Sequence, residues 1–324
     1  MKKQDYMCLG FPELTDVSER TNIADLFLSS KRRIGIYLLR FPDGDYYVGQ
    51  TNDVVRRFSQ HLHDKGPITE FSFFPARKKD LDCLEQDCIS RLEHKCNLKN
   101  ISLITYPQIE TDFDGLMDRE EQSTWLDYEG AVPRHFSRNR DKNYWKQLER
   151  RYADRFSHLM EDPYFKQYFL PVMQKYVKYC IPEPFLTEMS FWSCSCLPYF
   201  GRKSDILIRM NLRSCEVLTV GYNRDPVIFY YDFHACKSVL SPRETKQLKK
   251  QFSTLSFFDH QYESAGQDQC AFRFQNFNEV MEALDHPVCL KAIKTFNLGQ
   301  MRKGATLYHQ FHCVALAKLL LSGK

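Results

Sequence analysis

The sequence Ile-Gly-Ile-Tyr-Leu-Leu-Arg-Phe-Pro-Asp-Gly-Asp-Tyr-Tyr-Val-Gly-Gln occupies residues 34–50 and decides the fold of the first third of the chain. Residues 34–41 are rich in aliphatic and aromatic side chains, which favour a β-strand. Residues 42–45 (Pro-Asp-Gly-Asp) are a strong turn signal, and residues 46–50 provide a second strand. The stretch therefore predicts an antiparallel hairpin.

The segments around this hairpin extend it to a small domain. The predicted elements are a helix over residues 11–30, a helix from Asn52 or Asp53 to about His63, a strand over 69–74 and a helix from Asp80 to about Cys96. A sheet of this size buries its apolar surface against the helices that flank it. The expected fold class is α+β, with a small three-stranded antiparallel sheet flanked by helices.

The second half of the chain also has the composition of a folded domain. Its predicted elements are two helices over residues 143–180 that break at Asp162-Pro163, strands over 190–197, 206–220 and 227–233, a helix from Ser241-Pro242 and a closing helix over about 305–321. The strand predicted over 206–220 has room for a bulge near Arg213-Ser214. We expect this half to be a larger α+β domain.

Charge changes abruptly between these two parts. Residues 108–130 are strongly acidic, and residues 132–155 are strongly basic. Such a block is the best candidate for a connector. We therefore expect a first domain over residues 1–104, a charged connector with a helix over 105–155, and a second domain over 156–324.

The composition places few limits on function. The chain of 324 residues has a net charge of only +4, which neither requires nor excludes a basic surface for nucleic acid. We find no secretory signal and no apolar run long enough for a membrane span, so we read the 12 cysteines as reduced thiols of a cytoplasmic protein. The cluster Cys83, Cys88, His94 and Cys96 lacks the Cys-x2-Cys pair typical of structural zinc.

Side chains suited to phosphoryl chemistry lie in the first hundred residues. Arg57 and His61 are four residues apart in a predicted helix, so they share one face. Glu85 lies beside the apolar stripe of a later helix. A carboxylate suits Mg²⁺, which binds phosphate oxygens and water together, and an arginine supplies donors shaped for phosphate. His61 and the strand residues Tyr37 and Tyr47 are available for proton transfer.

The order of these residues resembles that of the GIY-YIG nuclease family. Gly35-Ile36-Tyr37 and Tyr47-Val48-Gly49 match the two halves of the motif, and the resemblance covers roughly residues 33–101. It implies a nuclease that uses Mg²⁺ or Mn²⁺ and takes nucleic acid, DNA in our reading, as substrate. The residues that it implies for catalysis are Tyr37, Tyr47, Arg57, His61 and, as the metal ligand, Glu85. We favour Tyr47 as the general base and Tyr37 as the residue that positions the attacking water.

One residue departs from the family pattern. Some relatives carry a lysine directly after the second half of the motif, where this chain has Gln50. If that lysine helps to position the attacking water, Lys31, Arg56 or a residue of the C-terminal part has to replace it.

Nucleic-acid contacts are expected from both parts of the chain. The candidates are Arg56, Asn97, Asn100, Arg138, Arg140 and Lys146. Asn97 or Asn100 corresponds to the asparagine that often ends the family's domain. The other reading of the basic stretch is a solvated helix face, and the acidic stretch is either a solvated segment or a shield that mimics phosphate.

These observations predict a metal-dependent endonuclease that hydrolyses phosphodiester bonds in DNA, in restriction, phage defence, homing or repair. The alternatives within nucleases are a structure-specific or RNA-directed enzyme and a nuclease subunit of a larger complex. The alternative from another class is an inactive scaffold that binds nucleic acid. The C-terminal domain is expected to recognise the substrate or to bind a partner protein or a second copy of the chain, and no membrane contact is expected.

Overall fold

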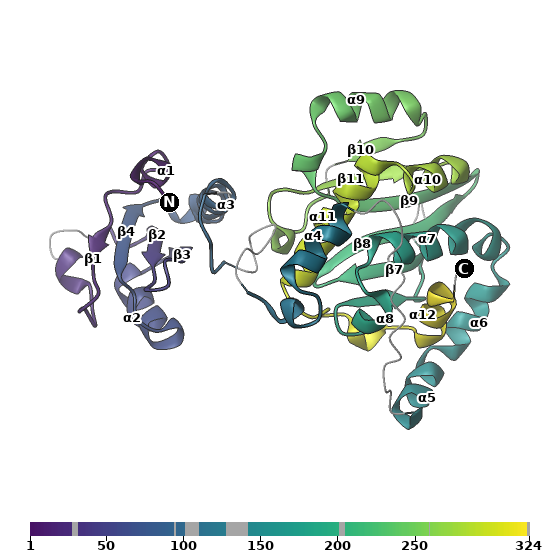
Figure 1. Ribbon diagram of the computed structural model, residues 1–324, viewed down its shortest axis with the longest axis horizontal. Coiled ribbons are helices and arrows are strands. Elements are labelled where there is room, and N and C mark those ends of the chain that lie inside the picture. Colours follow the sequence, from purple (N-terminus) through teal and green to yellow (C-terminus); the bar gives the residue numbers. More distant parts are fainter. Residues whose placement is uncertain are drawn as a thin grey trace. The chain divides into compact units, whose positions relative to one another are not determined.

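The computed structural model describes residues 1–27, 32–93, 95–100, 110–127, 142–200, 205–258 and 260–322, and gives no side chains for 142–144 (Figure 1). The chain divides into two compact units: the N-terminal unit, Met1–Glu110, and the C-terminal unit, Thr111–Lys324. The expected division into residues 1–104, a connector over 105–155 and a second domain over 156–324 stays a prediction. Within the described residues, no helix has both the length and the apolar character needed to cross a membrane.

The predicted hairpin is present at the centre of the N-terminal unit. Strand β2 (Gly35–Arg40) pairs antiparallel with β3 (Tyr46–Thr51), so that Tyr37 lies opposite Gly49. Strand β4 (Glu70–Pro75) pairs with the other side of β2. The predicted α+β fold is thus confirmed, with one addition: the short β1 (Thr15–Asp16) pairs with β4 and makes a four-stranded sheet in the order β1-β4-β2-β3.

The predicted helices after β3 and after β4 both form. Helix α2 spans Val54–Lys65, and its N-cap Asp53 accepts hydrogen bonds from the main-chain N–H groups of Val55 and Arg56. Helix α3 spans Leu81–Leu92 and is shorter than the predicted helix, which ran to about Cys96. A short helix α1 (Lys3–Met7) lies at the start of the chain.

The helix predicted over residues 11–30 is wrong. The described part of this segment contains β1 and a 3-10 turn over Ala24–Phe27. Its apolar side chains pack on different faces of the sheet: Phe11 lies against Phe74, whereas Phe27 lies against Phe73. Burial on two faces stabilises an extended path around the edge of β4 more than a single helical stripe would.

Side chains alternate along the central strands and fill two cores. Ile36 and Leu38 pack with the apolar residues of α3, whereas Tyr37 and Leu39 pack with Phe58 of α2. The sheet therefore separates two layers, and β3 is its edge strand. Side chains from the two layers can therefore form one site where they come together at the edge strand β3.

The C-terminal unit contains a larger, mainly antiparallel sheet. Its seven strands are β5 (Trp192–Ser195), β6 (Tyr199–Phe200), β7 (Asp205–Leu212), β8 (Cys215–Arg224), β9 (Val227–Ala235), β10 (Ser256–Phe258) and β11 (Cys270–Phe274). Six of them follow the order β10-β11-β9-β8-β7-β5, and β6 pairs with β7. The single strand predicted over 206–220 is wrong, because the chain reverses at Arg213, whose φ is 50°, and forms β7 and β8.

Helices surround this sheet. They are α4 (Arg119–Asp127), α5 (Lys142–Arg151), α6 (Ala153–Glu161), α7 (Leu170–Cys180), α8 (Pro184–Thr187), α9 (Pro242–Gln251), α10 (Phe277–Ala283), α11 (Pro287–Arg302) and α12 (Val314–Leu321). A π-helical turn over Phe165–Phe169 leads into α7. The break that we predicted at Asp162-Pro163 is confirmed, and the closing helix is shorter than the predicted one over 305–321.

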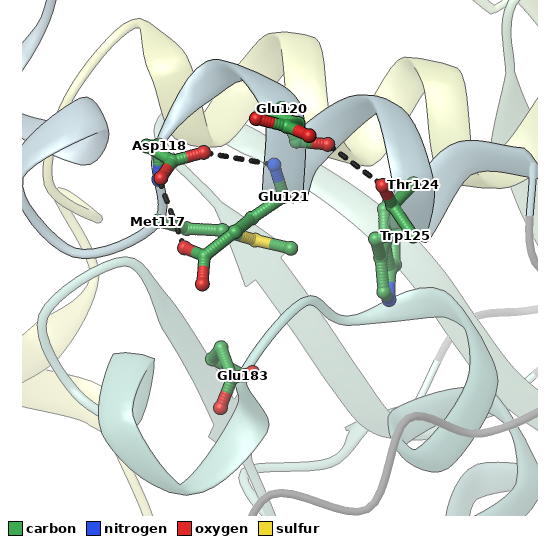
Figure 2. A pocket seen from close by; sticks show the side chains of 7 residues that line it. All are labelled: Met117, Asp118, Glu120, Glu121, Thr124, Trp125 and Glu183. Atoms are coloured by element: carbon green, nitrogen blue, oxygen red, sulfur yellow. Dashed lines mark hydrogen bonds between the residues drawn. The ribbon is translucent and has the colours of Figure 1, made fainter.

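The acidic stretch is attached to the C-terminal unit. The buried guanidinium of Arg302 donates to Gln122 at 2.8 Å and to Asp114 at 3.2 Å. Figure 2 shows that α4 presents Glu120 and Glu121 to a cavity of about 200 Å³, which Glu183 also lines. Carboxylates repel phosphate, so this cavity does not suit a nucleic-acid contact.

Candidate active site

Three polar side chains follow one face of helix α2 at intervals of four residues: Arg57, His61 and Lys65. The buried hydroxyl of Tyr37, on β2, lies 2.7 Å from Nε2 of His61 and accepts a hydrogen bond of 3.2 Å from Nε of Arg57. Because the hydroxyl accepts from Arg57, its own proton is free to be donated to His61. The hydroxyl of Tyr37 therefore links Arg57 to His61.

Tyr47, on β3, completes this group. Its ring stacks on Tyr37 with centroids 6.2 Å apart and lies 4.8 Å from the ring of His61. The ammonium of Lys65 lies 4.7 Å from the centre of the Tyr47 ring. Four residues predicted from the sequence, namely Tyr37, Tyr47, Arg57 and His61, therefore lie together on the α2 side of the sheet.

Burial controls the protonation of this group. It lowers the pKa of His61 to about 4, helped by the positive charges of Arg57 and Lys65, so His61 is neutral at pH 7. Burial also raises the pKa of Tyr37 well above its usual range and raises that of Tyr47, on which Glu85 acts in the same direction. At neutral pH the site therefore holds two protonated phenols beside a neutral imidazole.

The second motif glycine is required by packing. A methyl group at Gly49 would lie 2.2 Å from the hydroxyl oxygen of Tyr37 and 2.9 Å from the ring of Tyr47. A methyl group at Gly35 would lie 2.1 Å from the main-chain oxygen of Phe74. All three distances are shorter than those that real Cβ atoms show. Glycine at these positions allows the tyrosine ring and the neighbouring strand to approach so closely.

Glu85 reaches the site from the other side of the sheet. It lies on α3, is only 8% exposed, and accepts hydrogen bonds from the main-chain N–H of Gln50 at 3.1 Å and from the side-chain amide of Gln50 at 3.0 Å. The same amide donates to Asp82. Burial raises the pKa of Glu85, and the two bonds from Gln50 act against this rise. Gln50, which departs from the family pattern, thus holds the carboxylate in place.

Asn97 and Asn100 lie along the outer edge of β3, Asn97 with an exposed side chain and Asn100 with a buried one, and the contact with nucleic acid that we predicted for them stays a prediction. Along the outer edge of β3, the N–H of Tyr46 donates to the main-chain oxygen of Asn97 and the N–H of Val48 donates to the side chain of Asn100. The amide of Asn100 also donates to the oxygen of Val48 at 2.6 Å. Asn100 is buried, and its bonds pair the strand edge as another strand would.

The end of β3 brings together the cluster on the α2 side and the pair of Gln50 and Glu85 on the α3 side. The side chain of Gln50 points to the α3 layer and contacts Glu85. Its neighbour Gly49 has no side chain, which leaves space on the α2 side for the hydroxyl of Tyr37. The negative charge of Glu85 raises the pKa of Tyr37 and of Tyr47, and the positive charge of Arg57 acts to lower the pKa of Glu85. All five residues predicted as catalytic are thus brought to one edge of the sheet.

The surroundings of Glu85 fit a divalent metal ion. The hydrogen bonds described for this buried carboxylate come from Gln50, a neutral residue, whereas Arg57 acts on it through its charge, and burial of an anion without a hydrogen-bonded counter-charge is costly. No cluster of three or more His, Cys, Asp or Glu side chains suited to metal binding occurs among the described residues. Such a single carboxylate is typical of Mg²⁺ sites that are completed by water and phosphate.

The remaining predicted contacts are placed as follows. Arg56 and Lys146 are exposed, on α2 and α5, and Arg138 and Arg140 lie outside the described residues. Sequence reasoning missed Lys65, although its spacing of four from His61 was a usable signal. Because Lys65 lies beside Tyr47, it is a better substitute for the absent lysine at position 50 than Arg56.

Comparison with known proteins agrees with this geometry. Residues 33–90 match the family model of the GIY-YIG catalytic domain, and this range contains all five residues predicted as catalytic. No curated protein and no solved structure matches the chain. The N-terminal unit therefore contains a GIY-YIG catalytic domain, which is the catalytic domain of a family of nucleases.

Proposed function

We propose that this protein is a metal-dependent endonuclease that hydrolyses phosphodiester bonds in DNA. The observation that carries the proposal is the convergence of Tyr37, Tyr47, Arg57 and His61 with Glu85 around the end of strand β3. Each predicted group has a partner that orients it.

The side chains divide the reaction between them. Arg57 and Lys65 bind the scissile phosphate, because their charges face the tyrosine pair. Glu85 would hold a divalent ion, which would supply positive charge to the phosphate and to the leaving 3′-oxygen. Gln50 keeps the carboxylate turned toward that position. Mg²⁺ and Mn²⁺ both suit an oxygen ligand of this kind.

Proton transfer uses the tyrosines and the neutral histidine. Tyr47 takes a proton from the attacking water while its own phenolic proton passes to the hydroxyl of Tyr37. The proton of Tyr37 passes in turn to Nε2 of His61, 2.7 Å away. Water bonds to phosphorus, the bond from phosphorus to the 3′-oxygen breaks, and solvent protonates the leaving oxygen. Because the pKa of His61 is about 4, the imidazole is unprotonated at neutral pH and can take the proton, as a weak base.

The C-terminal unit supplies substrate choice in this proposal. A catalytic domain of this size contacts few phosphates, and specificity then comes from an attached domain. We assign residues 111–324 to recognition of the substrate or of a partner protein. The proposed setting is cytoplasmic, in restriction, phage defence, homing or repair.

A cleavage assay of the full chain tests the proposal. Supercoiled plasmid, linear duplex DNA, single-stranded DNA and RNA are incubated with Mg²⁺ or Mn²⁺, with and without EDTA. The proposal expects internal cleavage of a DNA substrate that EDTA abolishes. Cleavage of RNA alone would move the protein to the RNA-directed class, and a folded protein that cuts none of the four would support the inactive scaffold.

A further inference from the structure

A second cavity lies in the C-terminal unit, away from the acidic one of Figure 2. It has a volume of about 370 Å³, within the usual range of sites for small ligands, roughly 300–1,000 Å³. Helix α6 contributes Arg155, His158 and Leu159 to its wall, and the strands contribute Phe200 and Tyr222. The wall thus combines aromatic rings with cationic groups.

Phe200 is unusually exposed for a large apolar side chain. Its exposed fraction is 60%, and that of its neighbour Tyr199 is also 60%. The guanidinium of Arg224 lies 4.9 Å from the centre of the Phe200 ring and forms an ion pair with the buried Asp205. Because that ion pair restrains Arg224, the ring is supported on one side while most of its surface faces solvent.

Tyr222 forms a fixed aromatic wall. Its hydroxyl donates to Asp162 at 3.1 Å, and the other oxygen of Asp162 accepts from the main-chain N–H groups of Tyr164 and Phe165. The ring also packs edge-on against Tyr164, with centroids 5.1 Å apart. A side chain held at both ends loses little conformational entropy when a ligand stacks on it.

The cations of this region suit a phosphate backbone. Arg155 and His158 are exposed on α6, and within the described part of the chain the guanidinium of Arg155 has no ion-pair partner. Lys146 and Arg150, one turn apart on α5, add two exposed charges directly before α6 in the chain (Figure 1). Proteins that bind single strands combine such charges with aromatic platforms.

We propose that this cavity binds a base of single-stranded nucleic acid, which stacks on Phe200 and Tyr222 while Arg155 contacts the adjacent phosphate. The inference rests on the proposed nuclease function and names the substrate class that the C-terminal unit selects: a strand with at least one unpaired base. A duplex with all its bases stacked offers none to the cavity.

Binding in EDTA tests this inference apart from cleavage. The full chain is titrated against a fluorescein-labelled single-stranded 12-mer, and binding is followed by fluorescence polarisation. The probes are the normal strand, a strand of the same length whose sugars lack bases, a fully paired duplex and a free nucleoside monophosphate. Phe200→Ala and Arg155→Ala are the test variants. Lys249→Ala is the matched control, because Lys249 also lies over an aromatic ring, that of Phe257, at 5.2 Å.

The expected result is that the normal strand binds at least tenfold more tightly than the strand without bases and than the duplex. Phe200→Ala and Arg155→Ala each weaken strand binding by about five- to 100-fold, the range for loss of one base-stacking contact. Lys249→Ala changes it less than twofold. Equal affinity for strands with and without bases, or unchanged binding by Phe200→Ala, overturns the inference even if the protein cuts DNA. Competition by the free nucleotide at the same affinity also overturns it.

Discussion

The hydroxyl of Tyr37 lies 2.7 Å from Nε2 of His61, and this contact joins the central strand of the N-terminal sheet to helix α2. Arg57 donates to the same hydroxyl, so the phenolic proton is directed toward the imidazole. A hydrogen-bonded chain in a buried site polarises along its length. The pair is therefore the end point of the proton path that we assign to hydrolysis.

Replacing Tyr37 by phenylalanine removes this path and keeps the ring. The buried ring still fills its place beside Tyr47, so the fold is expected to persist. The turnover number should fall about 100- to 10,000-fold, the range for loss of a proton-transfer group, while the KM for DNA changes little. Steady-state kinetics on the preferred substrate measure both quantities. An equal loss in Tyr6→Phe, a buried phenol of the same unit, would indicate a general packing defect instead.

The low pKa of His61 makes the stability of the protein depend on pH. The folded pKa is about 4 and the ordinary value is 6.5, so between these values the unfolded chain binds one more proton than the folded one. The free energy of unfolding must then rise with pH in this window, by roughly 1.4 kcal/mol per pH unit for one proton. Urea unfolding at pH 5 and pH 6 should show this rise in wild type relative to His61→Gln, and parallel curves would contradict the assignment.

Gly49→Ala should lower the rate of catalysis strongly and should affect the stability of the rest of the chain less. The added methyl group would have to share space with the hydroxyl of Tyr37, which must move away from His61. A displacement of about 1 Å in a catalytic group costs on the order of 100-fold in rate. The matched control is Gly115→Ala, where a methyl group meets no atom within 4 Å. The rates of both variants on one DNA substrate check this, and full activity of Gly49→Ala would count against the described packing.

Asn100 should behave as part of the sheet. Alanine at this position leaves the N–H and C=O of Val48 without their partner, a loss of roughly 1–3 kcal/mol for each buried group. Hydrogen exchange of peptides that cover residues 46–51, followed by mass spectrometry, should become faster. Asn97→Ala is the control, since Asn97 contacts the strand through its main chain and its side chain is exposed. Exchange that is unchanged in Asn100→Ala would contradict this account of the strand edge.

Local signals in the sequence were enough for much of the N-terminal unit. The turn at Pro42-Asp43-Gly44 predicted β2 and β3, and Asp53 predicted the start of α2. The spacing of Arg57 and His61 predicted their shared face, which the structure shows. The family resemblance contributed the choice of Glu85, because nothing local links a residue of α3 to the end of β3.

Features that depend on distant contacts escaped prediction. The segment before β2 has a helical spacing of apolar residues, but Phe11 and Phe27 pack in the two different cores on opposite faces of the sheet. The reversal at Arg213 lacks the glycine or asparagine that usually marks a two-residue turn, so β7 and β8 read as one strand. The bonds between Gln50 and Glu85 exist only because β3 is an edge strand whose outer N–H groups need acceptors.

The most direct test of the central claim is the effect of one carboxylate on metal-dependent cleavage. Glu85→Gln keeps the size of the side chain and removes its charge, and Asp87→Asn makes the same change at an exposed residue of the same helix, where Asp87 pairs with Arg91. Initial rates on DNA are compared over a Mg²⁺ titration. The account predicts a loss of at least about 1,000-fold for Glu85→Gln that added Mg²⁺ does not restore, with Asp87→Asn close to wild type. A folded Glu85→Gln variant that cuts DNA as fast as wild type would contradict it.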